Sequence, residues 1–154
     1  MNKSVENIID LFTEVRQSTM KRLRAVPEGK ENWRIAEGKM SIADIAHHLI
    51  ELDKWTMEKL KNPALRAIDG VVNAVVINSR KDYENLLEEL NRILEDKILA
   101  VKNLTYWDLE KKIFDDRFGK EVNIWFVIMR GNIDHEIHHR GELAAYLQFL
   151  NVGA

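Results

Sequence analysis

The histidines of this 154-residue sequence fall into two groups that could hold a metal ion. His47 and His48 are adjacent, and His135, His138 and His139 lie in one short stretch much later in the chain. Neutral imidazole is the commonest metal ligand among side chains, and a buried imidazole without a partner costs free energy. Because the second group lies in the most apolar stretch of the sequence, metal binding is the chemistry that these residues favour.

Helical spacing selects among the five histidines. His135 and His139 are four positions apart, so they project from one helix face about 40° apart at 100° per residue. His138 points about 80° away from the middle of that pair, although it can also pair with His135 three positions earlier. His48 borders the apolar face of its expected helix, whereas His47 falls among charged side chains. The predicted ligands are therefore His48, His135 and His139, and the alternative through His138 stays open.

Three neutral imidazoles leave a fourth coordination position open, which is the pattern of catalytic rather than structural metal sites. A divalent ion there would act as a Lewis acid and lower the pKa of a bound water or thiol. The ligand type favours zinc and also suits nickel, iron or manganese. The expected chemistry is therefore the activation of water or a thiol for reaction with a small-molecule substrate.

Residues 135–139 also match the H-E-x-x-H motif of zincin metalloproteases, in which Glu136 would be the general base. Context argues against a protease, because only 15 residues follow His139 and leave almost no room for a downstream third ligand. The upstream edge strand that would bind an extended peptide is not evident in the sequence either. The motif alone is therefore a weak indication.

Two further residues on the histidine face are candidates for catalytic roles. Glu142 follows His139 by three positions and could orient its imidazole, accept a proton near a bound water, or form an ion pair with Arg140 or another exposed cation. Tyr146 follows His139 by seven positions, and its phenol could donate to a bound anion or pack in the core. The sequence leaves these alternatives open.

The elements that must position these residues are amphipathic helices, indicated by apolar residues at three- and four-residue steps. Helices are predicted over about 3–26, from Ser41 to about Lys61, where Asn62-Pro63 stops the helix, over about 80–103, and from about Asn123 or Ile124 to Leu150. Ser41 and Asp44 are a near match to a capping box. The last helix is apolar on nearly all sides, which predicts that it is buried in the middle of the protein. Together these segments predict an all-α, up-down four-helix bundle in one domain spanning 1–154.

The connections give weaker signals. Residues 64–78, which include Val71 and Val72, could form a helical turn or a short extended piece, and they could cover the site or simply join two helices. Residues 104–122 form a long connection with turn signals at Asp115, Asp116 and Gly119, where a short hairpin could occur.

Composition narrows the class of protein. Glycine occurs 7 times and proline 2 times, which favours helices over sheet-rich folds. A net charge of −2 lacks the basic stripe of a nucleic-acid binder. No cysteine is present, so disulfides, thiol nucleophiles and cysteine-based zinc sites are excluded. The first ten residues lack the apolar core of a signal peptide, and charges interrupt every apolar stretch before it could span a membrane. The expected location is the cytoplasm.

Two stretches resemble the signatures of a known family, the DinB/YfiT-like superfamily. S-I-A-D-I-A-H-H-L at 41–49, preceded by Asn32-Trp33-Arg34, resembles its second-helix signature, and H-E-I-H-H-R-G-E-L at 135–143 resembles its fourth-helix signature. The resemblance covers essentially the whole chain and implies a four-helix bundle of the DinB-like type. It also implies a metal held by His48, His135 and His139. Glu142 stands where the family usually has glutamine, and Ile35 stands where a proline is common.

The resemblance implies several functions. Members of the family include S-transferases and isomerases that use low-molecular-weight thiols, others are called metal-dependent hydrolases, and many are homodimers. The expectation is therefore a homodimeric, metal-dependent thiol transferase or hydrolase with a small-molecule substrate and, in the transferase case, a small thiol as partner. The alternatives are a non-catalytic bundle that binds a metal or ligand in a stress response, and histidines that are structural and bind no metal.

Overall fold

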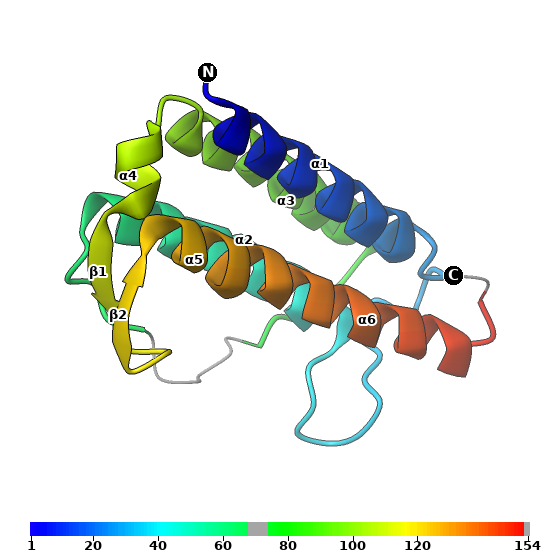
Figure 1. The fold of residues 1–154 in the computed structure, drawn as a ribbon. Coiled ribbons are helices and arrows are strands. Elements are labelled where there is room, and N and C mark those ends of the chain that lie inside the picture. Colours follow the sequence, from blue (N-terminus) through cyan, green and yellow to red (C-terminus); the bar gives the residue numbers. More distant parts are fainter. Residues whose placement is uncertain (68–73, 153–154) are drawn as a thin grey trace.

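The computed structural model describes residues 1–67 and 74–152 of the chain. Its long helices are α1 (Lys3–Arg24), α2 (Ile42–Lys61), α3 (Arg80–Val101) and a last helical segment made of α5 (Ile124–Ile128), the π-helical turn η1 (Met129–Ile133) and α6 (Asp134–Phe149). Between α3 and α5 lie a short helix, α4 (Tyr106–Glu110), and an antiparallel hairpin of β1 (Lys112–Asp115) and β2 (Lys120–Asn123). The predicted helices and the predicted hairpin are confirmed (Figure 1).

Side-chain caps fix where the first three long helices begin. Asn2, Ser41 and Ser79 each accept a hydrogen bond from the backbone amide three residues on. Ser41 and Asp44 form the complete, reciprocal capping box that the sequence predicts. Caps of this kind contribute roughly 1 kcal/mol each. The start of α2, which carries His48, is therefore set by its own sequence.

Hydrogen bonds between the helices show their directions. The start of α1 is joined to the end of α3 by Asn2 and Leu104, and the end of α1 to the start of α3 by Leu23 and Tyr83, so these helices are antiparallel. For α2 and α6, His48 contacts His135 and the hydroxyl of Tyr146 donates to Met40, so this pair is antiparallel too. In Figure 1, α1 and the last helical segment run in one direction, and α2 and α3 run in the other. The predicted four-helix bundle is confirmed, with its helices ordered up-down-down-up rather than in strict alternation.

The parallel arrangement of α2 and α3 requires a connection that returns along the bundle. This connection lies between Lys61 and Arg80, and its described parts are residues 62–67 and 74–79. At its far end, the amide of Val75 donates to Asp44, and the backbone of Ile77 exchanges two hydrogen bonds with the Asn32 side chain. The chain therefore returns to the start of α2 before α3 begins. The predictions for Val71 and Val72 lie outside the described residues.

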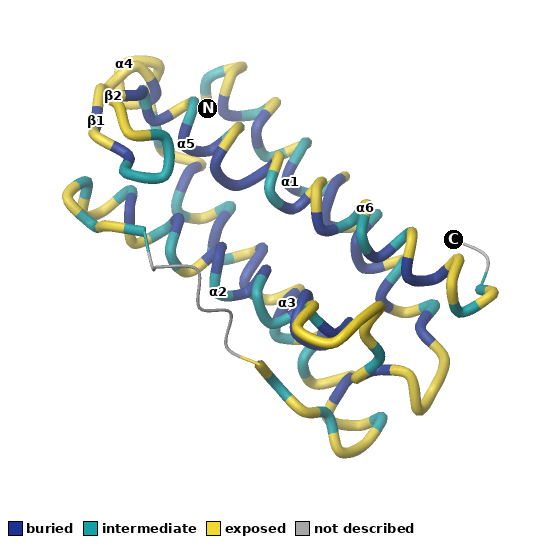
Figure 2. The backbone as a smooth tube through the Cα atoms, turned by 90° about the horizontal axis from the view of Figure 1, so that it is seen from below, coloured by how far each residue is buried: buried dark blue, intermediate teal, exposed yellow. Residues whose placement is uncertain are grey.

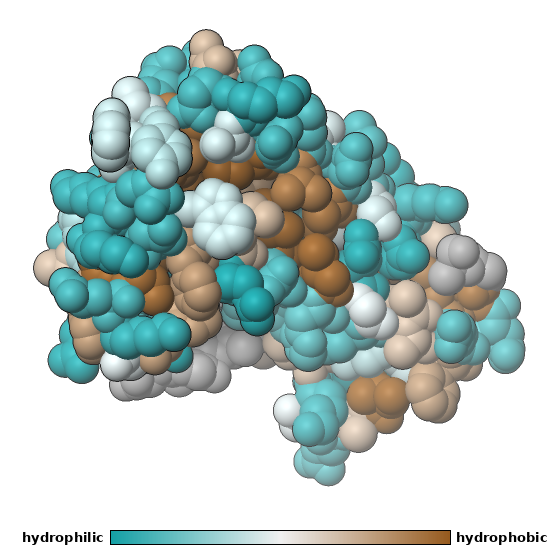
Figure 3. Space-filling view, in the orientation of Figure 1, coloured by the Kyte–Doolittle hydropathy of each residue, from teal (hydrophilic) through white to brown (hydrophobic). Residues whose placement is uncertain are grey.

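The last helical segment lies at the edge of the bundle, so the prediction that it is buried in the middle is wrong. Trp125 is 41% exposed and Ile137 is 37% exposed. Figure 3 shows apolar residues gathered along the seam between α1 and this segment. The segment is apolar on most sides because one side supplies the core and another carries exposed apolar residues. Among the described residues, no helix combines the length and hydropathy needed to cross a membrane.

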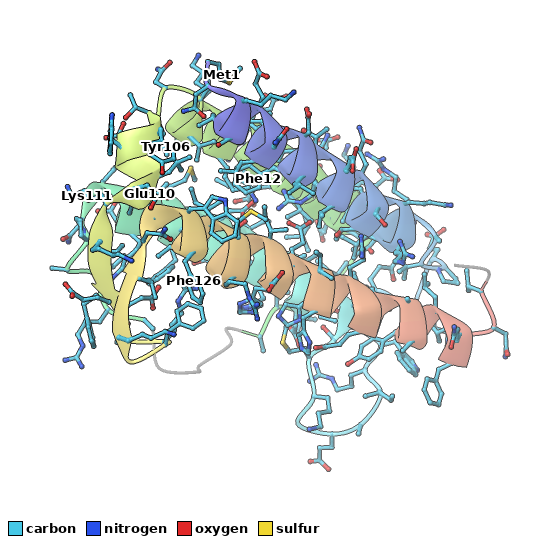
Figure 4. All side chains as sticks on the ribbon, viewed as in Figure 1. Met1, Phe12, Tyr106, Glu110, Lys111 and Phe126 are labelled. Carbon is cyan, nitrogen blue, oxygen red and sulfur yellow. The ribbon has the colours of Figure 1, made fainter. Side chains whose placement is uncertain are left out.

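The core consists of two apolar clusters. One joins the end of α1, α2, the first half of α3 and the end of α6. The other joins the first half of α1, the end of α3, α4, the hairpin, α5 and η1. The inner faces of all four helical segments are buried (Figure 2). Phe12 extends from α1 into the interior (Figure 4). Charged residues are buried between the two clusters, and they bear directly on the position of the histidines.

Candidate metal centre

The three predicted ligands lie together between α2 and α6. One ring nitrogen each of His48, His135 and His139 lies within 4.8 Å of the other two. The Nε2 atoms of His48 and His135 are 3.0 Å apart. His139 is 6% exposed, whereas His48 and His135 are half-buried. The helical count from the sequence therefore selected side chains that the structure brings together.

The histidine group fits a divalent ion by its donors and by its burial. Both ring nitrogens of His139 are buried and have no hydrogen-bond partner in the part of the chain that the structure describes. Burial and the neighbouring imidazoles lower the pKa of His135 to about 4 and that of His139 to about 3, and burial also lowers the pKa of His48. The three rings are therefore neutral near pH 7, with lone pairs available to a metal such as zinc.

Glu142 lies beside the group and contacts two histidines. Its Oε1 is 2.7 Å from Nε2 of His138 and 3.4 Å from Nδ1 of His139. Of the alternatives drawn from the sequence, an ion pair with Arg140 is not formed among the described residues. His138 is exposed and groups with Glu142 and His139 rather than with His48. His138 therefore belongs to a second group, His138, His139 and Glu142, which shares only His139 with the three predicted ligands.

Tyr146 joins the end of α6 to the start of α2. Its hydroxyl donates to the carbonyl of Met40 at 2.9 Å, and its ring meets that of Trp33 edge-on with centroids 5.2 Å apart. The side chain is buried. These contacts favour the packing role that the sequence left open, and a catalytic role for Tyr146 stays a prediction.

Glu136 is engaged by another helix. Its two carboxylate oxygens accept hydrogen bonds from Nε and Nη2 of Arg16, at 2.8 and 3.0 Å, and its side chain is 3% exposed. A carboxylate paired in this way with a buried arginine is not placed to act as general base beside the histidines. The H-E-x-x-H match therefore does not indicate a protease.

The Arg16–Glu136 pair is part of a buried ionic layer that the sequence analysis missed. We use this name for Arg16, Asp53, Lys97, Asn132 and Glu136. Asp53 accepts from Arg16 at 2.7 Å, from Lys97 at 2.7 Å and from Asn132 at 2.9 Å. The two cations balance the two carboxylates, and every long helical segment contributes a member. Although burial opposes it, the charges of Lys97 and Arg16 hold the pKa of Asp53 below its usual value.

The buried ionic layer adjoins the histidine group along the chain. Asn132 lies in the π-helical turn three residues before His135, and Glu136 directly follows His135. Asp53 lies five residues after His48 on α2. The layer therefore holds α2 and the last helical segment at a fixed height and rotation relative to each other, which is what three ligands from two helices require.

The fold and this site define a class of protein, an all-α bundle in which two antiparallel helices present a three-histidine group. Comparison with known families agrees with that class. The sequence profile of the DinB superfamily matches residues 11–143, and the chain belongs to this superfamily. A search of curated proteins found no match.

Solved structures of DinB-like proteins share the fold. A DinB-like protein from Bacillus cereus is 18% identical, with a TM-score of 0.74 over 96% of this chain and 93% of the other. One from Bacillus subtilis is 19% identical, with a TM-score of 0.69 over 94% and 92%. YfiT from Bacillus subtilis, described as "a probable metal-dependent hydrolase with an unusual four-helix bundle topology", is 13% identical, with a TM-score of 0.72 over 96% and 90%. At these identities the likeness concerns the fold.

Proposed function

We propose that this chain is a metal-dependent enzyme that activates water or a thiol for hydrolysis or S-transfer on a small molecule. In this proposal His48, His135 and His139 hold one divalent ion, with zinc favoured by the donor set. The observation that carries it is the buried ring of His139, whose two nitrogens lack partners beside two further neutral imidazoles. The description of YfiT as a probable metal-dependent hydrolase supports the same general class.

The residues of the chain prepare this site for an ion in two ways, through burial of the imidazoles and through Glu142. A divalent ion, when bound, supplies Lewis-acid chemistry and lowers the pKa of a water or thiol beside it. Burial keeps the imidazoles neutral and ready to bind. Oε1 of Glu142 lies 3.4 Å from Nδ1 of His139 without a hydrogen bond in this structure, and in this proposal it accepts from Nδ1 when Nε2 of the ring holds the ion. The homodimer and the cytoplasmic location expected from the sequence stay predictions.

Metal content is the first test. Untagged protein purified without chelator is expected to contain about one metal ion per chain by elemental analysis. The triple variant His48→Ala/His135→Ala/His139→Ala should contain almost none, because no ligand of the group remains. His47→Ala is the matched control and should retain the metal, since His47 lies 4.0 Å from Glu51 and outside the group. Wild-type protein that takes up no zinc, nickel, iron or manganese would overturn the proposal.

Catalysis is tested separately from metal binding. Metal-loaded protein is screened with hydrolysable esters and amides, and with electrophiles in the presence of low-molecular-weight thiols. Turnover that disappears in the triple variant supports the enzyme. A protein that binds metal at the three histidines and turns over none of these substrates would instead be the non-catalytic metal-binding bundle.

Glu142 is expected to act by orienting His139, and two substitutions separate this role from proton transfer. Glu142→Leu should weaken metal affinity by roughly 10–100-fold, the usual loss when a ligand histidine loses its outer partner. Glu142→Gln should retain most of the affinity and activity, because an amide oxygen still accepts a hydrogen bond. Metal affinity is measured by competition with a chromophoric chelator. If Glu142→Gln binds metal normally and loses turnover, Glu142 is the proton acceptor instead.

A further inference from the structure

The turn of the hairpin places an arginine beside the metal centre. Arg117 lies between β1 and β2, and its Cζ is 4.0 Å from the ring centroid of Trp55. Its Nη1 donates to the carbonyl of Gly131 at 3.1 Å. Trp55 follows His48 by two helical turns, and Gly131 precedes His135 by four residues in the antiparallel partner. Both contacts therefore lie on the hairpin side of the histidine group.

The position of the Arg117 guanidinium is tightly determined. Asp115, which is fully buried, accepts from Nε at 3.1 Å and from Nη2 at 2.8 Å. A Cβ atom at Gly131 would overlap Nη2, so glycine is needed for the guanidinium to lie against the helix. The ring of Phe118 lies 5.5 Å from Cζ and packs edge-on against Phe126, with centroids 4.9 Å apart. Phe126 projects toward the hairpin (Figure 4).

The guanidinium of Arg117 has N–H donors that its contacts with the protein do not use. Arginine carries five N–H groups, and the contacts with Asp115 and Gly131 use three of them. The others, one on Nη1 and one on Nη2, have no acceptor in the described part of the chain. The side chain is 20% exposed, so solvent and small ligands reach it.

The guanidinium of Arg117 lies close to the histidine group along both helices. Gly131, whose carbonyl it binds, lies about one helical turn before His135, and Trp55, on which it stacks, lies two turns after His48. A cation at this position opposes the binding of a divalent ion at the histidines. An anionic group lying between the two would be attracted by both, which turns an unfavourable arrangement into a recognition site.

We propose that Arg117 is the substrate-recognition residue of the centre, and that the substrate is a small molecule carrying a carboxylate or phosphate group. The anionic group accepts from the free N–H groups of Arg117, the indole of Trp55 forms a flat wall beside it, and the reacting part of the molecule lies at the histidines. Guanidinium suits both kinds of anion because its planar donors match their oxygen pairs. This inference rests on the proposed function, since it names a substrate class for the same site.

The inference is tested by measuring the affinity of the protein for succinate, inorganic phosphate and neutral succinamide by calorimetry. Each compound is titrated into zinc-loaded protein and into metal-free protein. Wild-type protein should bind at least one of the two anions and should bind succinamide far more weakly. Arg117→Gln should weaken anion binding at least about tenfold and leave the zinc content unchanged. The tighter of the two anions identifies the group that the site recognises.

A second variant keeps the result clear if Arg117→Gln disturbs the fold. Gly131→Ala retains the arginine but displaces its guanidinium, and alanine is favourable within a helix. It should weaken anion binding as Arg117→Gln does. Lys120→Gln is the matched control, because Lys120 is an exposed cation of the same hairpin that contacts Phe126, and it should bind as wild type.

The inference is overturned if wild-type protein binds neither anion better than succinamide, or if both Arg117→Gln and Gly131→Ala retain full affinity. The metal-free arm separates this failure from failure of the metal centre. A protein that takes up none of zinc, nickel, iron and manganese contradicts the proposed function, while a loss of anion binding in metal-free Arg117→Gln still supports Arg117 as the recognition residue.

Discussion

Replacing Arg16 by methionine is expected to lower the free energy of unfolding by about 3–5 kcal/mol, as measured by urea denaturation. Arg16 is 1% exposed and donates to the carboxylates of both Glu136 and Asp53. Its removal leaves two buried carboxylates with Lys97 as the remaining cation of the layer, and an uncompensated buried charge is among the most destabilising defects in a protein. The loss is a large fraction of the 5–15 kcal/mol that stabilises typical domains.

Arg92→Met is the matched control for Arg16→Met. Arg92 lies on α3 and pairs with Asp96 at 3.4 Å, but the two side chains are 61% and 44% exposed. Exposed pairs of this kind contribute about 0–1 kcal/mol. Equal losses in the two variants would contradict the interpretation that burial of the ionic layer makes Arg16 important.

In the metal-free protein, acidification from about pH 6.5 to about pH 3 is expected to lower the free energy of unfolding by several kcal/mol. The pKa of His135 is about 4 and that of His139 about 3 in the folded state, against an ordinary value of 6.5. Between these values the unfolded chain binds protons that the folded chain does not, so acid favours unfolding. Above pH 6.5 the imidazoles are neutral in both states, and the contribution is complete.

Urea denaturation at a series of pH values, with chelator present, measures this dependence. The double variant His135→Gln/His139→Gln should lose most of it between about pH 6.5 and 4.5. That interval avoids Asp53, whose effect begins only below its ordinary value of 3.8. His47→Gln is the control and should follow wild type. A double variant with the same dependence as wild type would show that other groups cause it.

The clustering of His48, His135 and His139 could be predicted from sequence because the relevant information is local, while their role as metal ligands stays a prediction. Four residues of helix place His135 and His139 on one face whatever else the chain does. The same count distinguishes His48 from its neighbour His47, and the structure brings the three selected rings together. The helical count could not predict the protonation state of the imidazoles, because their lowered pKa values depend on burial between two helices.

The buried ionic layer was missed although the sequence contains a signal for it. Arg16 lies four residues after Phe12 and four before Met20, within the apolar stripe of its helix. Lys97 is placed in the same way between Ile93 and Val101. A charge at an apolar position indicates a buried partner. The partner itself is not readable, because the ion pairs of the layer join residues 37 to 120 positions apart.

Helix directions and the placement of the hairpin are also non-local. Periodicity predicts that α2 and α3 exist, but it does not predict their relative direction. The sequence between them is long enough to allow a parallel arrangement, but its length alone does not require that arrangement. Arg117 appears in the sequence as an ordinary turn residue after Asp115 and Asp116. Its contact with Gly131 depends on how the hairpin folds back onto the last helical segment.

The buried ionic layer has a consequence for how a metal ion would reach and leave the histidine group under the proposed function. A slide of the last helix by one turn would move Glu136 about 5.4 Å along the axis and away from Arg16. Such alternative packings therefore leave charges unpaired inside the core and are strongly disfavoured. The three imidazoles are thus preorganised before an ion arrives, unlike the ligands of a zinc finger, which fold only around their metal. Exchange of the ion at this centre need not involve unfolding, so metal availability rather than chain stability would govern its occupancy.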